Sequence, residues 1–364
     1  MAALRSPRVL ITGGAGFIGS HLAVALAGPC DVAIYDNLNP QSHRGNPSNF
    51  ARIKACGLQH FQEDIRDLSK LQHTLRAFDP EIIVHLAAET GTGQSFAQPA
   101  HYAEVNITGT ANLIEAARTD APNLRRVILG SSRAVYGEGA YVDALGCPTR
   151  AMMRNAADMA RGDFKVRDMH RHILRAVPTN SDCLPEPVSI YAASKLMQEQ
   201  LLTHAFWNSD IEVGILRLQN VYGPSQSLSN PYTGVLSIFA HQIRERVELN
   251  IYEDGRITRD FVYVEDVSDA FVQMVLAPRM PQDILDIGSG RGGAEILDIA
   301  RRMLGLFGPQ HAGFKITGAF RPGDIRHAVA DIRAAQSLLG WEPRTPLSHG
   351  LARLMRWSAQ QQAA

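Results

Sequence analysis

The sequence predicts an α/β fold in which helices cover both faces of a doubly wound parallel sheet, with a smaller, partly interleaved α/β domain in the C-terminal half. Short β-branched runs alternate with segments of helical periodicity, and a glycine-rich turn joins the first run to the first helical segment. Strands separated by helices of this length form βαβ units, which build parallel sheets. The 364 residues suffice for two domains at about 150 residues each.

The first third of the chain contains five predicted strands and two clear helical segments. Runs rich in Val, Ile and Leu predict the strands, and apolar residues spaced three and four apart predict the helices. The strands are Arg8–Thr12, Asp31–Tyr35, Leu58–Gln62, Ile82–Leu86 and Arg126–Gly130, and the helices are Gly19–Leu26 and His101–Ala117.

An insertion interrupts this alternation between Glu138 and Pro187. It carries Pro, Gly, Asn and mixed charge, lacks a clean strand, and predicts one helix around Arg150–Arg161. The pattern then resumes with a predicted helix and two predicted strands. These are Ser189–Trp207, Glu212–Leu218 and Asp283–Ile287.

The chain after Leu218 predicts the second domain. Pro224 and Pro231 are followed by two short β-like segments, Leu249–Tyr252 and Phe261–Val264, and then by helices. We therefore expect a first domain at 1–222, including the insertion 138–187 and completed by 262–288. The second domain is expected at 223–261 and 289–364.

Charge and cysteine content exclude several classes of protein. Lys plus Arg number 36 against 36 Asp plus Glu, so no basic surface for nucleic acid or anionic lipid is expected. The four cysteines form no C-x-x-C pair, and no apolar run approaches the roughly 18 residues of a membrane span. A β-like run begins within a few residues of Met1, which leaves no room for a leader. We expect a cytoplasmic protein with reduced thiols and neither nucleic acid nor membrane as partner.

The first turn predicts a dinucleotide site. Gly14, Gly16 and Gly19 match G-x-G-x-x-G between a strand and a helix, where small residues admit a pyrophosphate to the helix N-terminus. Asp36 ends the second strand about 20 residues later. Its carboxylate suits two ribose hydroxyls and repels a 2′-phosphate, which favours NAD over NADP. Ordinary turn roles for the glycines and for Asp36 are the alternatives.

A tyrosine, a lysine and a serine form the predicted catalytic set. Tyr191 and Lys195 lie four residues apart and share one helix face. The ammonium and a nicotinamide ring together would lower the phenol pKa from its usual value near 10, making Tyr191 a general base. Ser132 ends a strand at the carboxyl edge of the sheet, where its hydroxyl can bridge substrate and tyrosine.

Together these motifs resemble the extended short-chain dehydrogenase/reductase superfamily, and within it the NAD-dependent nucleotide-sugar epimerase/dehydratase branch. The likeness spans almost the whole chain. Its motifs are the glycine turn, Asp36, His85–Ala88, Val105–Asn106, the serine strand, the Tyr191–Lys195 helix, Arg217–Pro224, Arg259–Phe261 and Arg321–Asp324. The segments Glu89–Ser95 and Tyr222–Gly234 are most similar to the dTDP-L-rhamnose 4-epimerase-like group, beside the UDP-galactose 4-epimerase-like proteins.

The resemblance implies a Rossmann-type first domain, bound NAD, a nucleotide sugar between the domains, and a homodimer formed through helices His101–Ala117 and Ser189–Trp207. The implied cofactor contacts are Gly13, Gly16, Phe17, Ile18, Gly19, Asp36, Asn37, Asp64, Ile65, Leu86, Ala87, Ala88, Asn106, Tyr191 and Lys195. The implied substrate contacts are Thr90, Gly91, Ser132, Arg133, Asn220, Gly234, Val235, Tyr252, Arg259, Arg321 and Asp324.

Among the substrate contacts, Asn220 and Arg259 would bind the diphosphate, because a guanidinium suits bidentate phosphate contact. Arg321 and Asp324 would bind phosphate and ribose, and Tyr252 would pack on the base. Surface ion pairs and an ordinary packed aromatic are the alternatives.

The implied reaction is 4-epimerisation of a dTDP- or UDP-linked (deoxy)hexose: oxidation at C4 to a 4-keto intermediate, rotation, and re-reduction. Dehydratases and decarboxylases of the branch place acidic residues where this chain has Arg133 and Ala134. A dehydratase, an NAD(P)-dependent reductase or dehydrogenase, and a non-catalytic dinucleotide sensor are the alternatives. Cys147, Cys183, His170 and His172 match no standard zinc spacing, and no metal is predicted.

Overall fold

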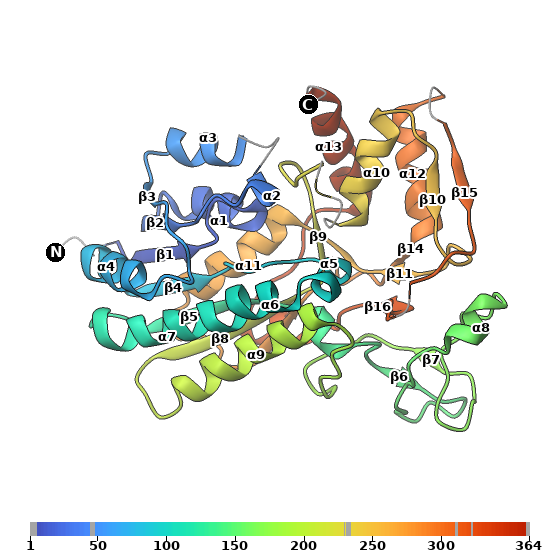
Figure 1. The fold of residues 1–364 in the computed structure, drawn as a ribbon, viewed down its shortest axis with the longest axis horizontal. Coiled ribbons are helices and arrows are strands. Elements are labelled where there is room, and N and C mark those ends of the chain that lie inside the picture. Colours follow the sequence, from blue (N-terminus) through green and yellow to red (C-terminus); the bar gives the residue numbers. More distant parts are fainter. Residues whose placement is uncertain are drawn as a thin grey trace.

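The computed structural model describes residues 6–43, 48–228, 230, 234–309, 312–321 and 323–361, and its centre is a seven-stranded parallel sheet (Figure 1). The strand order is β13-β8-β5-β4-β1-β2-β3. The chain leaves β1 toward one edge, then returns to β4 and builds toward the other, which confirms the predicted doubly wound fold. The strands are β1 (Arg8–Thr12), β2 (Asp31–Tyr35), β3 (Gln59–Phe61), β4 (Ile82–His85), β5 (Arg126–Ser132), β8 (Glu212–Leu218) and β13 (Ile284–Ile287).

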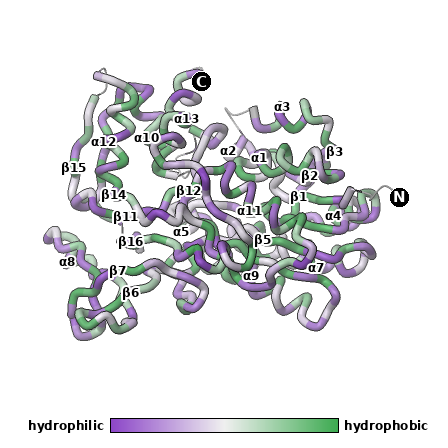
Figure 2. The backbone as a smooth tube through the Cα atoms, turned by 180° about the vertical axis from the view of Figure 1, so that it is seen from behind, coloured by the Kyte–Doolittle hydropathy of each residue, from purple (hydrophilic) through white to green (hydrophobic). Residues whose placement is uncertain are grey.

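Helices cover both faces of this sheet. On one face lie α1 (Phe17–Leu26) and α11 (Val264–Leu276). On the other lie α4 (Leu68–Phe78), α7 (Gly109–Asp120) and α9 (Ile190–Ala205). Apolar stretches gather around the central strands and α11 (Figure 2), and the strands are apolar throughout because both of their faces are buried.

A third apolar core lies in the C-terminal part of the chain. It is built by α10 (Val235–Arg244), α12 (Ile296–Phe307) and α13 (Leu347–Gln360), together with β10 and β15. These elements stand at the right of Figure 1. The small strands beside them are β9 (Asn220–Tyr222), β10 (Leu249–Ile251), β11 (Thr258–Arg259), β12 (Phe261–Tyr263), β14 (Ala294–Glu295), β15 (Phe314–Ile316) and β16 (His327–Ala328). This separate core agrees with a second domain, but the boundaries at 222, 262 and 288 stay a prediction.

The insertion differs from its prediction. The helix expected over Arg150–Arg161 is only α8 (Ala156–Ala160), because the Asn155 side chain caps it by accepting the Ala157 N–H at 2.8 Å. The insertion also contains strands, since β6 (Tyr141–Val142) pairs antiparallel with β7 (Arg175–Ala176). Its backbone joins the C-terminal part, where Thr179 N donates to Val329 O at 2.9 Å.

The helix expected over His101–Ala117 is also interrupted. It consists of α6 (Pro99–Tyr102), a π-helical segment Ala103–Thr108, and α7. Such segments often occur at functional sites, and this one contains the buried Asn106. The short helices α2 (Pro40–His43), α3 (Ser48–Ala55) and α5 (Thr92–Ala97) were not expected, and other boundaries differ by one to three residues. None of the helices described has the length and apolar character needed to cross a membrane.

Candidate active site

The glycine turn and the loop after β4 meet too closely for side chains. Gly13 has φ +69°, and a Cβ there would lie 2.7 Å from Ala87 N. A Cβ on Gly19 would lie 2.3 Å from Gly13 O. Glycine is therefore required at both positions. Helix α1 begins directly after this turn with Phe17 and Ile18.

Asp36 holds the turn as well as facing a cavity. Its Oδ2 accepts the Ala15 N–H at 3.0 Å, its Oδ1 accepts the Leu38 N–H at 2.8 Å, and His43 Nε2 lies 3.3 Å from Oδ1. The cavity measures about 110 Å³. Eight predicted cofactor residues line it, namely Gly13, Gly16, Asp36, Asn37, Ile65, Leu86, Ala87 and Ala88. A carboxylate beside glycines with no room for side chains fits a dinucleotide.

Asp64 stands next to this cavity rather than in its wall. Its Oδ2 accepts hydrogen bonds from Arg66 Nη2 at 2.9 Å and Asn37 Nδ2 at 3.0 Å. The bonds from Arg66 hold the pKa of Asp64 below its usual range, so the carboxylate is ionised at neutral pH.

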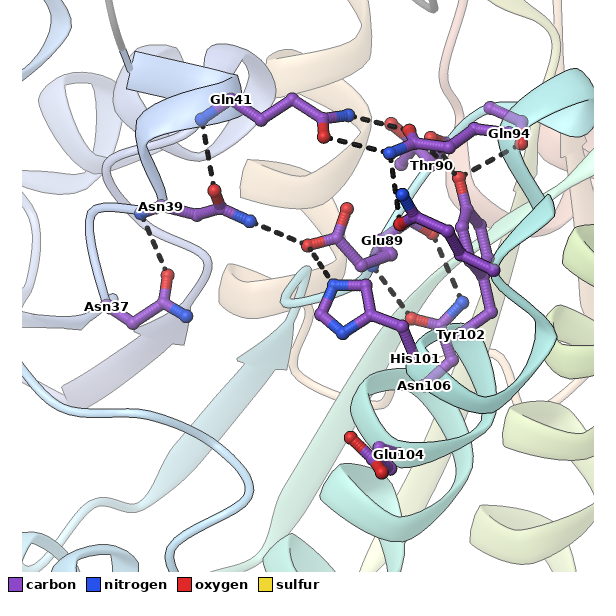
Figure 3. Close-up of polar contacts among 12 residues, drawn as sticks. Asn37, Asn39, Gln41, Glu89, Thr90, Gln94, His101, Tyr102, Glu104 and Asn106 are labelled. Carbon is purple, nitrogen blue, oxygen red and sulfur yellow. Dashed lines mark hydrogen bonds and ion pairs between the residues drawn. The ribbon is translucent and has the colours of Figure 1, made fainter.

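The loops after β2 and β4 are joined by side chains, as Figure 3 shows. Asn39 Nδ2 donates to Glu89 Oε1 at 2.7 Å, and His101 Nε2 lies 3.3 Å from the same oxygen. Gln41 and Gln94 exchange two amide hydrogen bonds of 2.6 and 2.9 Å. Because Asn39 and Glu89 both line the cavity, this bridge forms part of its wall.

Asn106 binds the backbone of the loop after β4 through its side-chain amide. Its Oδ1 accepts the Glu89 N–H at 2.8 Å, and its Nδ2 donates to Glu89 O at 3.1 Å (Figure 3). The same Nδ2 also donates to Ser194 Oγ at 2.8 Å. The side chain therefore positions the loop, and its direct contact with a cofactor stays a prediction.

The N-terminus of α9 brings Tyr191 to Ser132. Ser189 caps this helix by accepting the Ala192 N–H at 3.1 Å, which places Tyr191 in the first turn. Burial raises the pKa of Tyr191, while the hydrogen-bonding interaction with Ser132 acts in the opposite direction. The protein chain alone therefore does not produce the lowered pKa expected from Lys195 and nicotinamide together, because burial outweighs the serine interaction.

A buried ion pair holds α9 against the sheet. Glu199 accepts hydrogen bonds from Arg217 of β8, with Nε at 3.0 Å and Nη2 at 2.6 Å, and from Ser131 of β5. Glu199 and Arg217 are 1% and 2% exposed. This contact joins α9 to both β5 and β8.

Lys195 lies one helical turn below Tyr191 and is 3% exposed. Its Nζ donates to Gln198 Oε1. Burial lowers the pKa of Lys195 to about 8, although the charge of Glu199 opposes the change. The ammonium is therefore present at neutral pH.

Two predicted substrate arginines interact electrostatically, and one of them directly follows Ser132 in the chain. Arg133 Nη2 donates to Gly137 O at 2.6 Å, and Arg259 Nη2 donates to Ile325 O at 3.0 Å. Burial, and next the charge of Arg259, lower the pKa of Arg133 to about 9. Within the described ranges, neither guanidinium has a carboxylate within 4 Å, so the pair is suited to an anion.

The remaining predicted substrate residues are spread around the C-terminal part and the loop after β4. The Arg321 guanidinium lies 4.7 Å from the Tyr252 ring, and its Nη2 donates to Tyr252 Oη at 3.3 Å. Asp324 accepts Arg154 through its backbone oxygen. Asn220 begins β9, Gly234 caps α10 before Val235, and the carbonyls of Thr90 and Gly91 accept Tyr102 Oη at 2.6 and 3.0 Å. Residues 229, 231–233 and 322 of the motifs lie outside the described residues.

The sequence reasoning missed a buried charged cluster between the insertion and the C-terminal part. Glu253 is 1% exposed and accepts Arg154 Nη1 at 2.9 Å and Arg326 Nη1 at 2.5 Å. Glu138 Oε2 accepts the Arg326 N–H at 3.0 Å. Since these residues lie far apart in the chain, no local pattern indicates the cluster. Gln198 was also missed. A polar residue on the apolar, buried face of α9 could have indicated a buried hydrogen-bonding role.

Neither Cys147 nor Cys183 forms a disulfide. Across the described parts of the chain, no three His, Cys, Asp or Glu side chains are grouped to hold a metal ion.

Comparisons with known proteins match almost the whole chain. Residues 10–144 match the family model for GDP-mannose 4,6 dehydratase, and residues 170–288 match the NAD dependent epimerase/dehydratase family. The dTDP-L-rhamnose 4-epimerase of Burkholderia thailandensis is 39% identical over 97% of this chain and 95% of its own length.

Solved structures agree with these matches. The UDP-glucuronic acid 4-epimerase of Bacillus cereus, in complex with UDP-glucuronic acid and NAD, has a TM-score of 0.77 at 28% identity, covering 97% of this chain and 99% of that one. The UDP-glucose 4-epimerase of Thermus thermophilus, in complex with NAD, also has a TM-score of 0.77, at 27% identity with the same two coverages.

Proposed function

This chain belongs to the NAD dependent epimerase/dehydratase family, and on that premise we propose that it is a nucleotide-sugar 4-epimerase acting on a dTDP- or UDP-linked (deoxy)hexose. Membership agrees with the resemblance drawn from the sequence motifs. One observation carries the choice of reaction: Ser132 and Tyr191 meet at the carboxyl edge of the sheet, and the residues that follow the serine are Arg133 and Ala134 rather than acids. Epimerisation needs no further acid or base beyond that set.

The cofactor would be held by residues that the fold has already brought together. The glycine turn and the start of α1 would receive the pyrophosphate, and Asp36 the adenosine ribose. Bound NAD supplies a hydride acceptor at C4 and, after the sugar has turned, the hydride donor. The bridge of Asn39, Gln41, Glu89 and Gln94 closes one wall of this cavity and would retain the cofactor between turnovers.

The catalytic roles fall to three side chains. Tyr191 Oη takes the proton of the sugar C4 hydroxyl and, after the sugar has turned, returns it to the C4 oxygen, while the hydride is added to the other face of C4. Ser132 Oγ holds the sugar oxygen and the phenol in register. The Lys195 ammonium stabilises the phenolate electrostatically, which offsets the cost of burying that charge.

The substrate would lie between the sheet edge and the C-terminal core. The partly buried pair Arg133 and Arg259 would bind the diphosphate, because two guanidiniums that repel each other, neither with a carboxylate of the described residues within 4 Å, favour a doubly charged ligand. Arg321, Tyr252 and Asp324 would contact ribose and base, and Asn220, Gly234 and Val235 would flank the phosphates.

The reaction can be tested with UDP- and dTDP-sugars carrying deuterium at C4, incubated with the protein and followed by NMR. A 4-epimerase yields two C4 epimers that both keep the deuterium at C4. A 4-keto-6-deoxy product with deuterium moved to C6 would identify a dehydratase instead. Conversion that consumes stoichiometric NAD(P)H would identify a reductase.

We also propose a cytoplasmic homodimer that serves carbohydrate biosynthesis. Apolar side chains on α5, on α9 and just beyond α9 support a self-association surface, with Phe96, Met197 and Trp207 exposed by 54%, 43% and 68%. Light scattering should give twice the chain mass, and a monomer at micromolar concentration would contradict the dimer.

A further inference from the structure

A chain of buried polar side chains lies behind Lys195. Lys195 Nζ donates to Gln198 Oε1. Gln198 Nε2 lies 2.8 Å from Thr110 Oγ1 and 3.2 Å from His85 Nε2, and His85 Nδ1 lies 2.7 Å from Thr12 Oγ1. Gln198, Thr110 and Thr12 are fully buried, and His85 is 1% exposed. The path runs from the catalytic helix to the first strand.

The lysine sets the orientation of the Gln198 amide. An ammonium only donates, so the atom of Gln198 that faces it must be the oxygen. The Gln198 NH₂ group therefore donates to Thr110 Oγ1 and lies next to His85 Nε2, which is also 2.9 Å from Thr110 Oγ1. Burial, and next the charge of Lys195, lower the pKa of His85 to about 3, in agreement with a neutral ring.

We propose that Gln198 is a positioning residue, which holds the Lys195 ammonium at its working place beneath Tyr191 and preserves its charge. The catalytic part of this inference rests on the proposed function, whereas the hydrogen bonds that hold Lys195 do not. Thr110 anchors the amide from the other side by donating to Asn106 O at 2.6 Å. Gln198 therefore cannot turn without leaving two buried donors unpaired, which is costly.

Other groups that face Lys195 do not replace this acceptor. His85 Nε2 on β4 lies against Gln198 and Thr110, and Glu199 on α9 is engaged by Arg217 and Ser131. The hydroxyl of Tyr191 is the group whose phenolate form Lys195 is proposed to stabilise, so it is not an alternative acceptor for the ammonium. Gln198 Oε1 is thus the neutral acceptor that keeps a proton on a buried amine.

The same series of hydrogen bonds extends to the loop after β4, which lines the dinucleotide cavity. Thr12 Oγ1 accepts the Ala87 N–H at 3.3 Å, and Ala87 lines the dinucleotide cavity. Gln198 accordingly links the position of Lys195 to the loop after β4. A glutamine that served packing alone would not affect the protonation of the lysine.

NMR of protein labelled with ¹³Cε-lysine tests this on the protein as purified, without nucleotide sugar. The sequence has only five lysines, Lys54, Lys70, Lys165, Lys195 and Lys315, so Lys195→Met assigns the signal. In Gln198→Leu we expect the pKa of Lys195 to fall by about one pH unit, the size of a lost hydrogen bond to a charged group. In Gln198→Glu it should rise above the wild-type value. Gln200→Leu is the matched control, because Gln200 is exposed on the same helix.

Activity provides a second readout. Gln198→Leu should lower kcat about tenfold with KM unchanged and move the acidic limb of the kcat profile to higher pH, because the phenolate loses support. Equal Lys195 pKa values in wild type, Gln198→Leu and Gln198→Glu would overturn the proposal. If Gln198→Leu does not fold, the expected rise of the Lys195 pKa in Gln198→Glu tests the proposal by itself. Failure to epimerise any sugar would refute the proposed function while leaving the lysine titration intact.

Discussion

The phenol of Tyr191 shows how far a single residue depends on its neighbours. Burial raises its pKa, and a buried tyrosine with no support is a poor base. Ser132 opposes this rise, and the Lys195 ammonium is proposed to do so once the phenolate forms. The serine comes from the end of β5 and the lysine from α9, so the set exists only when those two elements dock.

Replacing Tyr191 by Phe removes the proposed proton carrier and leaves the dinucleotide cavity intact. We expect kcat to fall roughly 10² to 10⁴-fold, the usual contribution of a general acid or base. The cofactor content of the purified variant should equal that of the wild type. Epimerase assays and release of NAD on denaturation measure the two quantities, and full activity would show that another group moves the proton.

Replacing Asp36 by Ala removes the carboxylate that faces the cavity. We expect NAD affinity to fall about tenfold to a hundredfold, the range of hydrogen bonds to a charged group, without a gain in NADP binding. Asp31→Ala is the control, because Asp31 begins the same strand but is exposed. Calorimetric titration of the cofactor-free protein reports the affinities. Equal affinity in Asp36→Ala would refute the ribose assignment.

Sequence alone predicts residues whose chemistry is tied to a local spacing, such as the glycines before α1, whose close packing the structure shows, and the pair Tyr191 and Lys195, whose catalytic role stays a prediction. It could not identify residues whose role arises from distant partners. Glu89 meets Asn39 from 50 residues away, and Gln198 meets His85 from 113 residues away. Such contacts depend on strand order, which no local pattern encodes.

Helix α9 carries the proposed catalytic pair, and a buried ion pair joins this helix to β8. Arg217→Met leaves Glu199 buried without its charged partner, which should lower the free energy of unfolding by about 3 to 5 kcal/mol. Arg353→Met is the control, because the pair Arg353 and Glu265 is 47% and 53% exposed and should contribute about 1 kcal/mol or less. Urea unfolding measures both, and similar losses would refute the special role of the buried pair.

The elements with strong periodicity were predicted well, and the irregular ones were not. Strands buried on both faces read as apolar runs, and all seven strands of the central sheet fall within predicted segments or extend them by at most two residues. The π-helical segment at Ala103–Thr108 was not predicted from the periodicity, and it contains Asn106, which binds the Glu89 backbone 17 residues away. The insertion was misread because the Asn155 cap shortens its helix.

The arrangement of the whole molecule explains why the site lies where it does. The strand order reverses between β1 and β4, and the loops that leave these strands on either side of that point line the dinucleotide cavity. The insertion and the C-terminal part meet through Glu253, Arg154 and Arg326.

The stability of the molecule should depend on pH through His21. Burial, and next the charges of Arg52 and Arg353, lower its folded pKa to about 3 from 6.5. The unfolded state therefore binds the additional proton, so this contribution is complete above pH 6.5 and is lost as the pH falls toward 3. Between pH 7 and 5 the loss is about 2 kcal/mol.

His21→Gln has no such proton, so its free energy of unfolding should fall less than that of the wild type between pH 7 and pH 5. Urea unfolding at both pH values measures the difference. Identical falls in the two proteins would show that His21 is not buried as a neutral ring.

The proposed 4-epimerase keeps its own NAD through each turnover and returns the hydride to the same sugar. Its most direct test is to incubate purified protein with dTDP- and UDP-sugars without added cofactor, follow C4 by NMR, and then denature the sample to identify the released dinucleotide. We predict interconversion of two C4 epimers and NAD in near-stoichiometric amount. An empty protein, or turnover only with consumed NAD(P)H, would contradict it.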